Sequence, residues 1–349
     1  MASLKFEIVN SPRVKEARKY NAQHMRLKAT AKKAGGKNPT QRMPTNNTLQ
    51  QYITHAVKFG EWCKKTYGCR HFGDCRSHIQ NYADHLMQEG KSAATIHTYL
   101  AGVCFVFDVP LEQIKKPIRH AADATRSRGH KKSDRRKDTK AEYSPRLSKF
   151  VEAIHIRRHE CQSLRQDCLT VDESGYLCVD IRKGKGGKQQ LQRVPFGSEE
   201  LVRSYFDGDA EKFVFSKEEM RNKLDLHHHR HMGALTAYRR YEQRLKDDPT
   251  YREQLICEIK DRWRKFNART LPEHELSGNY VMRGKNRALA EQYKFCYSFD
   301  RLAVLATSIF YLAHWRNNVT VVNYLLPGLL CEALEQIEEN NSNNESQIS

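Results

Sequence analysis

Residues 169–196 read LTVDESGYLCVDIRKGKGGKQQLQRVPF, and this stretch decides which fold the chain can adopt. It holds three short runs rich in β-branched, aromatic and other apolar residues, 169–171, 176–181 and 191–196. A glycine turn separates the first two runs, and the glycine-rich segment 183–188 separates the last two. Short runs bounded by such turns are typical of consecutive antiparallel strands. The sequence therefore predicts a small three-stranded antiparallel sheet.

The sequence on both sides of this stretch has a helical pattern. Apolar residues recur every three or four positions after Thr45, with Gly68 as a helix stop, and again over about 74–89 and from Ser92. Another amphipathic helix begins near Pro145, and after the third strand the sequence is mainly helical nearly to residue 330. We therefore expect a mainly α protein with one small sheet.

Composition divides the chain into segments. Residues 1–45 carry eleven Lys or Arg against two Glu, and residues 118–149 carry eleven against four acidic residues. Basic stretches with little to bury are typical of flexible segments. We therefore expect a basic flexible arm at 1–45, a helical domain at 46–117, a basic linker at 118–145, a second domain at 146–337 with a helical insertion at about 238–300, and a disordered polar tail at 338–349.

The overall charge favours a polyanionic partner. The formal net charge is +19 and the isoelectric point is about 9.5, which is typical of nucleic-acid-binding proteins. No run approaches the roughly 18 apolar residues that a membrane span needs, and the N-terminus lacks the apolar core of a signal peptide. We expect a cytoplasmic protein with no membrane partner.

The ten cysteines are scattered along the chain, and reduced thiols are the simplest interpretation. Cys63, Cys69 and Cys75 suggest zinc, but their spacing is not a common zinc-finger pattern. We therefore expect no metal at this cluster.

Four polar motifs could carry chemistry, although each has an ordinary structural explanation. Arg157 follows an amphipathic helix and could be a surface ion pair; the lysines of segment 183–188 could belong to a solvated hairpin. His227 and Arg230 share a helix face at i and i+3 and suit a phosphate, yet could form a polar surface turn. In the last motif, Tyr324 lies in an apolar stretch and could be a core residue. A cluster of His227, His228, His229 and His231 could alternatively bind a metal.

The order of these motifs resembles that of the tyrosine recombinase (phage integrase) superfamily, as found in integrases of bacterial mobile elements. Arg157 with Glu160, Leu164 and Asp167 resembles the first arginine motif, and residues 184–188 the lysine hairpin. Residues 226–231 resemble the second arginine motif and residues 312–325 the His-then-Tyr motif. Two features depart from the family: His155 stands where Gly is frequent, and the 84 positions from Arg230 to His314 are unusually many.

The resemblance implies a two-domain DNA clamp, made of a helical core-binding domain and a catalytic domain. It implies that Tyr324 attacks a DNA phosphate to form a 3′-phosphotyrosine, that Arg157 and Arg230 bind the phosphate oxygens, and that Lys185 protonates the leaving 5′-oxygen. His227 would assist proton transfer and His314 would hydrogen-bond the phosphate. The expected DNA-binding residues are Arg126, Arg128, Lys131, Lys132, Arg135, Arg136, Lys183 and Lys188.

The resemblance also sets expectations for partners and location. The partner would be duplex DNA, bound by a homotetramer with accessory DNA-bending proteins, in the cytoplasm of a bacterium and near its nucleoid. No cofactor or metal is required. The alternatives are a type IB topoisomerase-like or resolvase activity, a catalytically inactive DNA-binding relative, and a zinc-dependent enzyme that uses the histidine cluster.

Overall fold

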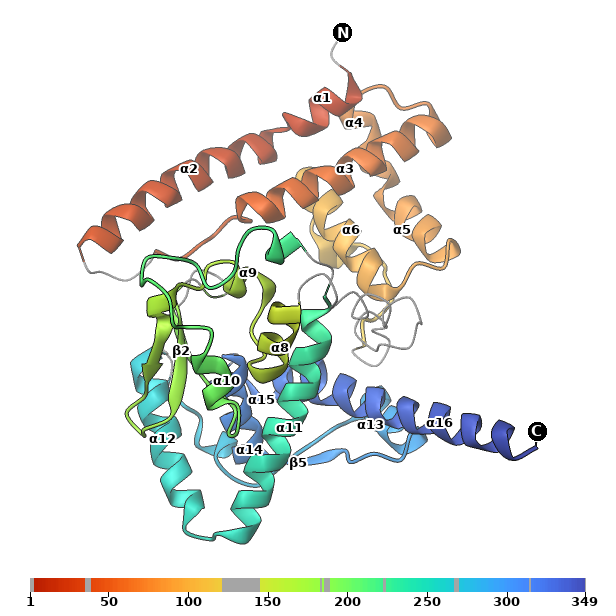
Figure 1. The fold of residues 1–349 in the computed structure, drawn as a ribbon. Coiled ribbons are helices and arrows are strands. Elements are labelled where there is room, and N and C mark those ends of the chain that lie inside the picture. The colour runs from red at the N-terminus through yellow and green to blue at the C-terminus, as the bar shows by residue number, and fades with distance from the viewer. Residues whose placement is uncertain are drawn as a thin grey trace. The chain divides into compact units, whose positions relative to one another are not determined.

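The computed structural model describes residues 3–34, 39–120, 145–182, 184, 189–221, 224–266, 270–313 and 315–348. The described chain is mainly helical with a small three-stranded antiparallel sheet, which confirms the predicted fold class (Figure 1). It divides into two compact units, residues 1–123 and 124–349. The division falls inside the segment that we expected to be a linker.

The first unit is a helical bundle that begins earlier than we predicted. Its elements are α1 (Leu4–Val9), α2 (Pro12–Lys33), α3 (Asn46–Tyr67), α4 (Phe72–Cys75), η1 (Arg76–His78), α5 (Ile79–Gln88), α6 (Ala93–Val106) and η2 (Leu111–Gln113). α3 and α6 approach closely at Gly102, where a Cβ atom would lie 2.9 Å from the Tyr52 Cα. The unit has one apolar core, to which each of its α-helices contributes.

The prediction of a flexible arm at 1–45 was wrong. Residues 4–33 form α1 and α2, because Val14, Ala17, Asn21 and His24 make a buried stripe at helical spacing beneath the charged face. The Asn21 amide then donates to the Pro44 carbonyl oxygen at 2.8 Å, which ties the segment after α2 to the helix. The many Lys and Arg residues concealed this stripe in the sequence.

The second unit surrounds the three-stranded sheet with helices. Its elements are α8 (Pro145–Ala153), α9 (Arg158–Cys161), η5 (Gln166–Cys168), β1 (Leu169–Val171), β2 (Leu177–Ile181), β3 (Gln190–Arg193), α10 (Glu199–Arg203), η7 (Glu219–Arg221), α11 (Leu226–Asp247), α12 (Tyr251–Phe266), η8 (Glu273–Glu275), β4 (Asn279–Val281), α13 (Gly284–Gln292), β5 (Ser298–Asp300), α14 (Arg301–Ala306), η9 (Thr307–Leu312), α15 (Asn317–Thr320), η10 (Val321–Leu325) and α16 (Leu326–Ile348). The strands pair antiparallel in the order β1-β2-β3, with Leu169 opposite Val179 and Cys178 opposite Arg193.

The segment that we expected to be an insertion, 238–300, is part of the core of this unit. α12 buries Tyr251, Leu255, Ile259 and Trp263 in the same apolar cluster as α11, α14 and α16. The segment is also not wholly helical, since β4 and β5 form a second, two-stranded sheet. It is therefore an integral layer of the unit rather than an appendage.

A buried ionic network joins α12 to the sheet. One carboxylate oxygen of Asp172, after β1, accepts hydrogen bonds from Arg193 of β3 at 2.7 Å and from Arg262 of α12 at 2.6 Å. Glu258 of α12 accepts a second bond from Arg193 at 2.8 Å. Burial alone would raise the pKa of Asp172, but the charge and hydrogen bond of Arg193 outweigh it and lower that pKa. The network therefore balances two guanidinium groups with two carboxylates.

The C-terminal part of the unit has an unusual backbone. η9 and η10 are π-helical. Between them, Ala313 has φ 50° and Trp315 has φ 61°, in the left-handed region that residues other than glycine rarely adopt. α16 follows directly and continues to Ile348, so the prediction of a disordered tail at 338–349 was wrong. Within the described residues, no helix is both long and apolar enough to cross a membrane.

Candidate functional site

Arg157 is fixed by a buried carboxylate. It lies just before α9, where the Glu160 side chain accepts from the Arg157 backbone N–H at 2.8 Å and from Arg157 Nη1 at 2.6 Å. Gln190 of β3 donates to the same Glu160 oxygen at 3.3 Å. Glu160 is only 1% exposed, so its charge depends on Arg157 for compensation. This contact gives a physical reason for the Arg-x-x-Glu spacing.

Arg230 lies in the first turns of α11 and is also 1% exposed. Asp225 begins this helix, because its carboxylate accepts the backbone N–H groups of His227 and His228. Arg230 Nη1 donates to the His155 carbonyl oxygen, and Nη2 donates to the Leu312 carbonyl oxygen at 3.1 Å. The first turns of α11 therefore place the Arg230 guanidinium group in the interior of the unit.

The two guanidinium groups converge on one oxygen atom. Arg157 Nη2 also donates to the Leu312 carbonyl oxygen, at 3.2 Å. Arg157 and Arg230 are far apart in the sequence, and the acceptor comes from a third segment, the end of η9. A single oxygen that accepts from two guanidinium groups is the geometry of an anion site.

Tyr324 completes this cluster. It lies in η10, is 4% exposed, and its ring centroid is 5.5 Å from the Arg230 guanidinium carbon. Burial lowers the pKa of Arg230 and the charge of Arg157 adds to this effect, whereas Tyr324 and Glu160 oppose it. A phenol thus lies beside the paired guanidinium groups.

Two histidines of α11 flank the tyrosine. The ring centroids of His227 and Tyr324 are 6.5 Å apart, and those of His231 and Tyr324 are 5.6 Å apart in an edge-to-face arrangement. His227 is exposed, whereas His231 is buried with no hydrogen-bond partner for its Nδ1 atom among the described residues. Burial lowers the pKa of His231 to about 3, which keeps its ring neutral.

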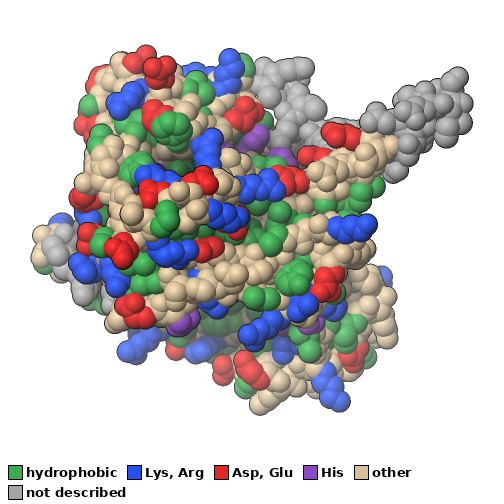
Figure 2. All heavy atoms as spheres, turned by 90° about the horizontal axis from the view of Figure 1, so that it is seen from below, with side chains coloured by type: hydrophobic (Ala, Val, Ile, Leu, Met, Phe, Trp, Pro, Cys, Tyr) green, Lys and Arg blue, Asp and Glu red, His purple; other side chains and the backbone are tan. Residues whose placement is uncertain are grey.

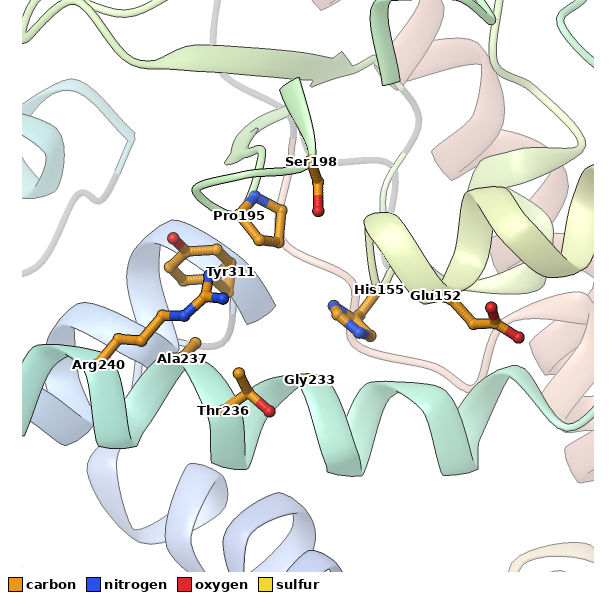
Figure 3. A pocket seen from close by; sticks show the side chains of 9 residues that line it. All are labelled: Glu152, His155, Pro195, Ser198, Gly233, Thr236, Ala237, Arg240 and Tyr311. Carbon is orange, nitrogen blue, oxygen red and sulfur yellow. The ribbon is translucent and has the colours of Figure 1, made fainter. Parts of the chain in front are cut away.

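A small cavity of about 150 Å³ is lined by His155, whose carbonyl oxygen accepts from Arg230, and by residues of α11 (Figure 3). His155 points toward the turn of α11 that carries Gly233, and the cavity continues past Ala237 to Arg240 and Tyr311. Burial lowers the pKa of His155 to about 3, and the charge of Arg230 acts in the same direction. The His155 ring is therefore neutral where it lines this cavity, and the backbone carbonyl oxygen of the same residue accepts from Arg230.

Four of the six predicted site residues lie in the described chain, and the structure brings them together: Arg157, His227, Arg230 and Tyr324. Lys185 and His314 lie outside the described residues. So do the predicted DNA-binding residues, namely Arg126, Arg128, Lys131, Lys132, Arg135, Arg136, Lys183 and Lys188.

Sequence reasoning missed two contributions to the site, the buried imidazole of His231 and the Leu312 carbonyl. His231 was considered only as a metal ligand. The described residues contain no group of three or more His, Cys, Asp or Glu side chains that could hold a metal ion, either at the histidines of α11 or at Cys63, Cys69 and Cys75. No protein-family model and no curated protein sequence matches this chain.

The surface of the described chain has mixed charge. On the face seen in Figure 2, Lys and Arg side chains lie among acidic and apolar ones. Ion pairs on the surface of the second unit include Lys246–Glu242 and Arg287–Glu291. The arginine cluster differs from such surface pairs because Arg230 is fully buried and two guanidinium groups donate to one neutral carbonyl oxygen, that of Leu312. It can therefore stabilise an anion that replaces the Leu312 carbonyl.

Proposed function

We propose that the chain is a site-specific DNA recombinase, an integrase that cuts and rejoins duplex DNA through a 3′-phosphotyrosine intermediate. The observation that carries this proposal is the convergence of Arg157 and Arg230 on one oxygen atom beside Tyr324. Cleavage of a phosphodiester requires charge neutralisation at the non-bridging oxygens and a nucleophile near the phosphorus atom. The two guanidinium groups and the phenol supply both.

Each step has a residue in this proposal. A non-bridging phosphate oxygen replaces the Leu312 carbonyl and accepts from both arginines. The Tyr324 oxygen forms a bond to phosphorus while the bond to the 5′-oxygen breaks. The tyrosine proton leaves with the help of His227, and Lys185 protonates the departing 5′-oxygen. His314 donates to the phosphate. The reverse reaction, with a new 5′-hydroxyl, rejoins the strands without an external energy source.

The assembly follows from the same proposal. The helical unit and the catalytic unit act as a clamp on duplex DNA, and the basic segment 118–145 contacts the DNA backbone through its arginines and lysines. Four copies on two duplexes would make the active complex. Because phosphate contacts release counterions, DNA affinity should fall steeply with salt concentration.

A covalent-trapping experiment tests the reaction. The purified chain is incubated with a pool of duplexes that have random central sequences and a nick, so that the short fragment released by cleavage is lost and a protein–DNA adduct accumulates. We expect the wild type to form the adduct, and peptide mapping to place the DNA on Tyr324. Tyr324→Phe should bind the pool normally and form no adduct.

Tyr311→Phe is the matched control, since it removes a phenol hydroxyl from the preceding segment η9 and should leave adduct formation intact. An adduct that persists in Tyr324→Phe would refute the proposal. A supercoiled plasmid that lacks the DNA sequence found in the adduct distinguishes a recombinase from a topoisomerase-like enzyme, because only the latter would relax it.

A further inference from the structure

His155 and Gly233 fit together so closely that a Cβ atom at position 233 would force the His155 ring to move. A Cβ atom on Gly233 would lie 2.2 Å from three atoms of the His155 ring, far inside the closest contact that carbon atoms tolerate. Figure 3 shows the ring directed at the α11 turn that carries Gly233. The absence of a side chain on α11 therefore creates the space for the imidazole.

The backbone of the same histidine holds Arg230. The His155 carbonyl oxygen accepts from Arg230 Nη1, and Arg230 lies three positions before Gly233 on α11. The segment 154–157 that carries His155 is short, with the Ile156 N–H donating to the Ile154 carbonyl oxygen at 2.9 Å. It leads directly to Arg157, so the position of the ring constrains a segment that contacts the Arg230 guanidinium group and carries Arg157.

We infer that His155 is a positioning residue for Arg230, and that the missing side chain at Gly233 leaves the space that its ring occupies. The inference rests on the proposed function, which it deepens. The His155 ring touches neither Tyr324 nor Leu312 in any described contact, and it acts only by fixing the carbonyl that orients the guanidinium group. A neutral ring suits this role because a second positive charge beside Arg230 would repel it.

The cavity next to the His155 ring determines where the ring moves when position 233 carries a side chain. It is lined by His155 and Gly233 and opens toward Thr236, Arg240 and Tyr311. A methyl group at position 233 would push the imidazole into this space. The 154–157 turn would then shift and the His155 carbonyl would no longer meet Arg230 in its present geometry.

The test uses three variants of the full chain and one control. Gly233→Ala places a methyl group in the space that the His155 ring occupies, His155→Gly removes the ring, and the double variant does both. Thr236→Ala is the control, because Thr236 is an exposed residue on the same helix that lines the same cavity. Measurements are the rate of adduct formation on the nicked duplex pool, the affinity for that pool, and NMR spectra of the histidine rings and of the Arg230 guanidinium group.

We expect Gly233→Ala to slow adduct formation by about 100-fold, since a displacement of about 1 Å at a catalytic group has effects of this order. DNA affinity should change by less than about twofold, since phosphate contacts away from the site dominate it. The double variant should regain the rate of His155→Gly, because the methyl group then has no ring to displace. The His155 ring should titrate closer to pH 6.5 in Gly233→Ala, as expected of a ring that has left its packed position for the cavity.

Two results would overturn the inference: a Gly233→Ala variant with normal rate and unchanged His155 and Arg230 spectra, or a double variant that remains as slow as Gly233→Ala while His155→Gly is fast. If the wild type forms no adduct, the proposed function fails, and the NMR spectra alone decide the positioning role. Arg230 signals that do not change when the ring is displaced would then reject it.

Discussion

Arg193 and Arg230 are both 1% exposed and lie in the same unit, but they have different kinds of partner. Arg193 pairs with the carboxylates of Asp172 and Glu258, and its guanidinium carbon lies 3.9 Å from the centroid of the Tyr176 ring. Arg230 donates to two neutral backbone carbonyls, and no carboxylate oxygen of the described chain contacts it.

The difference separates a structural guanidinium group from one that can bind a ligand. The network around Arg193 is electrically balanced within the protein. Among the described residues, the cluster around Arg230 has a second guanidinium group, that of Arg157, and one carboxylate, that of Glu160, which is hydrogen-bonded to Arg157. A buried excess of positive charge is unfavourable unless an anion joins it. We therefore expect substitutions in the network to reduce stability and substitutions in the cluster to reduce cleavage.

The largest expected effect is a loss of stability in the ionic network around Arg193. Asp172→Ala removes the carboxylate that Arg193 and Arg262 share. It leaves Arg193 with Glu258 and Arg262 with the Leu191 carbonyl oxygen. Breaking such a buried pair typically destabilises a protein by about 3–5 kcal/mol. Urea denaturation should show this loss. Asp261→Ala is the control, since its pair with Arg264 is exposed, and it should cost less than about 1 kcal/mol. Equal losses for both variants would contradict the distinction.

The corresponding change in the cluster is Arg230→Lys. An ammonium group cannot contact both a phosphate oxygen and the His155 carbonyl with the fork geometry of a guanidinium group. Loss of one preorganised donor slows such reactions by about 100- to 1000-fold. Adduct formation on the nicked duplex pool measures the rate, and DNA affinity should be unchanged. Arg239→Lys, in an exposed pair with Glu332, is the control and should react normally.

Acid should distinguish the two regions by the pH range in which each loses stability. His231 has a pKa of about 3 in the folded chain, below its ordinary value of about 6.5. The unfolded chain therefore binds more protons below pH 6.5, so stability falls as the pH falls, by about 2 kcal/mol at pH 5. The pKa of Asp172 is lowered from 3.8, so its contribution is lost only at more acidic pH.

Unfolding free energies between pH 7 and pH 4.5 test this expectation. His231→Phe keeps an aromatic ring against Tyr324 and should remove the His231 share of this loss, about 2 kcal/mol at pH 5. The share of His155, whose pKa is also lowered to about 3, should remain. His274→Phe is the control, because the His274 side chain is 71% exposed and should leave the slope unchanged. A slope that is the same in all three proteins would show that His231 does not titrate below its ordinary pKa.

The sheet was predictable from sequence because its signals are local. β1 and β2 are short runs rich in apolar residues and glycines follow both in the sequence, so their positions follow from neighbouring residues alone. β3 has one apolar residue and was predicted at 191–196 rather than at Gln190–Arg193. The helices of residues 4–33 were not predicted, because only the buried stripe of Val14, Ala17, Asn21 and His24 indicates them. The surrounding charges dominate the composition of that segment.

The site was predictable only in part, for a different reason. Arg157, Arg230 and Tyr324 carry side chains whose chemistry can be recognised in a sequence. The Leu312 carbonyl is a backbone group, so no residue type indicates that both arginines meet there. The space for His155 is likewise invisible, because it depends on Gly233 lying opposite a ring from another segment. Contacts between distant segments have no local signal.

The smallest expected effect concerns the backbone that presents the Leu312 carbonyl. Ala313 has φ 50° and ψ 43°, which is unfavourable for a residue with a Cβ atom by about 1 kcal/mol. Ala313→Gly relieves this strain but gives the unfolded chain more freedom, so stability should rise by less than about 1 kcal/mol. Glycine at position 313 also favours the backbone conformation in which the Leu312 carbonyl oxygen accepts from Arg157 and Arg230. Adduct formation should therefore slow, by at most about fivefold.

Asp108→Gly is the matched control for this prediction. Asp108, in the first unit, has φ 53°, nearly the same backbone strain, and its carbonyl oxygen accepts from Arg76 rather than from the cluster. Its substitution by glycine should change stability to a similar extent and leave the cleavage rate unaltered. A faster reaction in Ala313→Gly would mean that the Leu312 carbonyl does not compete with phosphate. The two guanidinium groups would then have to bind the phosphate through donors other than the pair that now meets at Leu312.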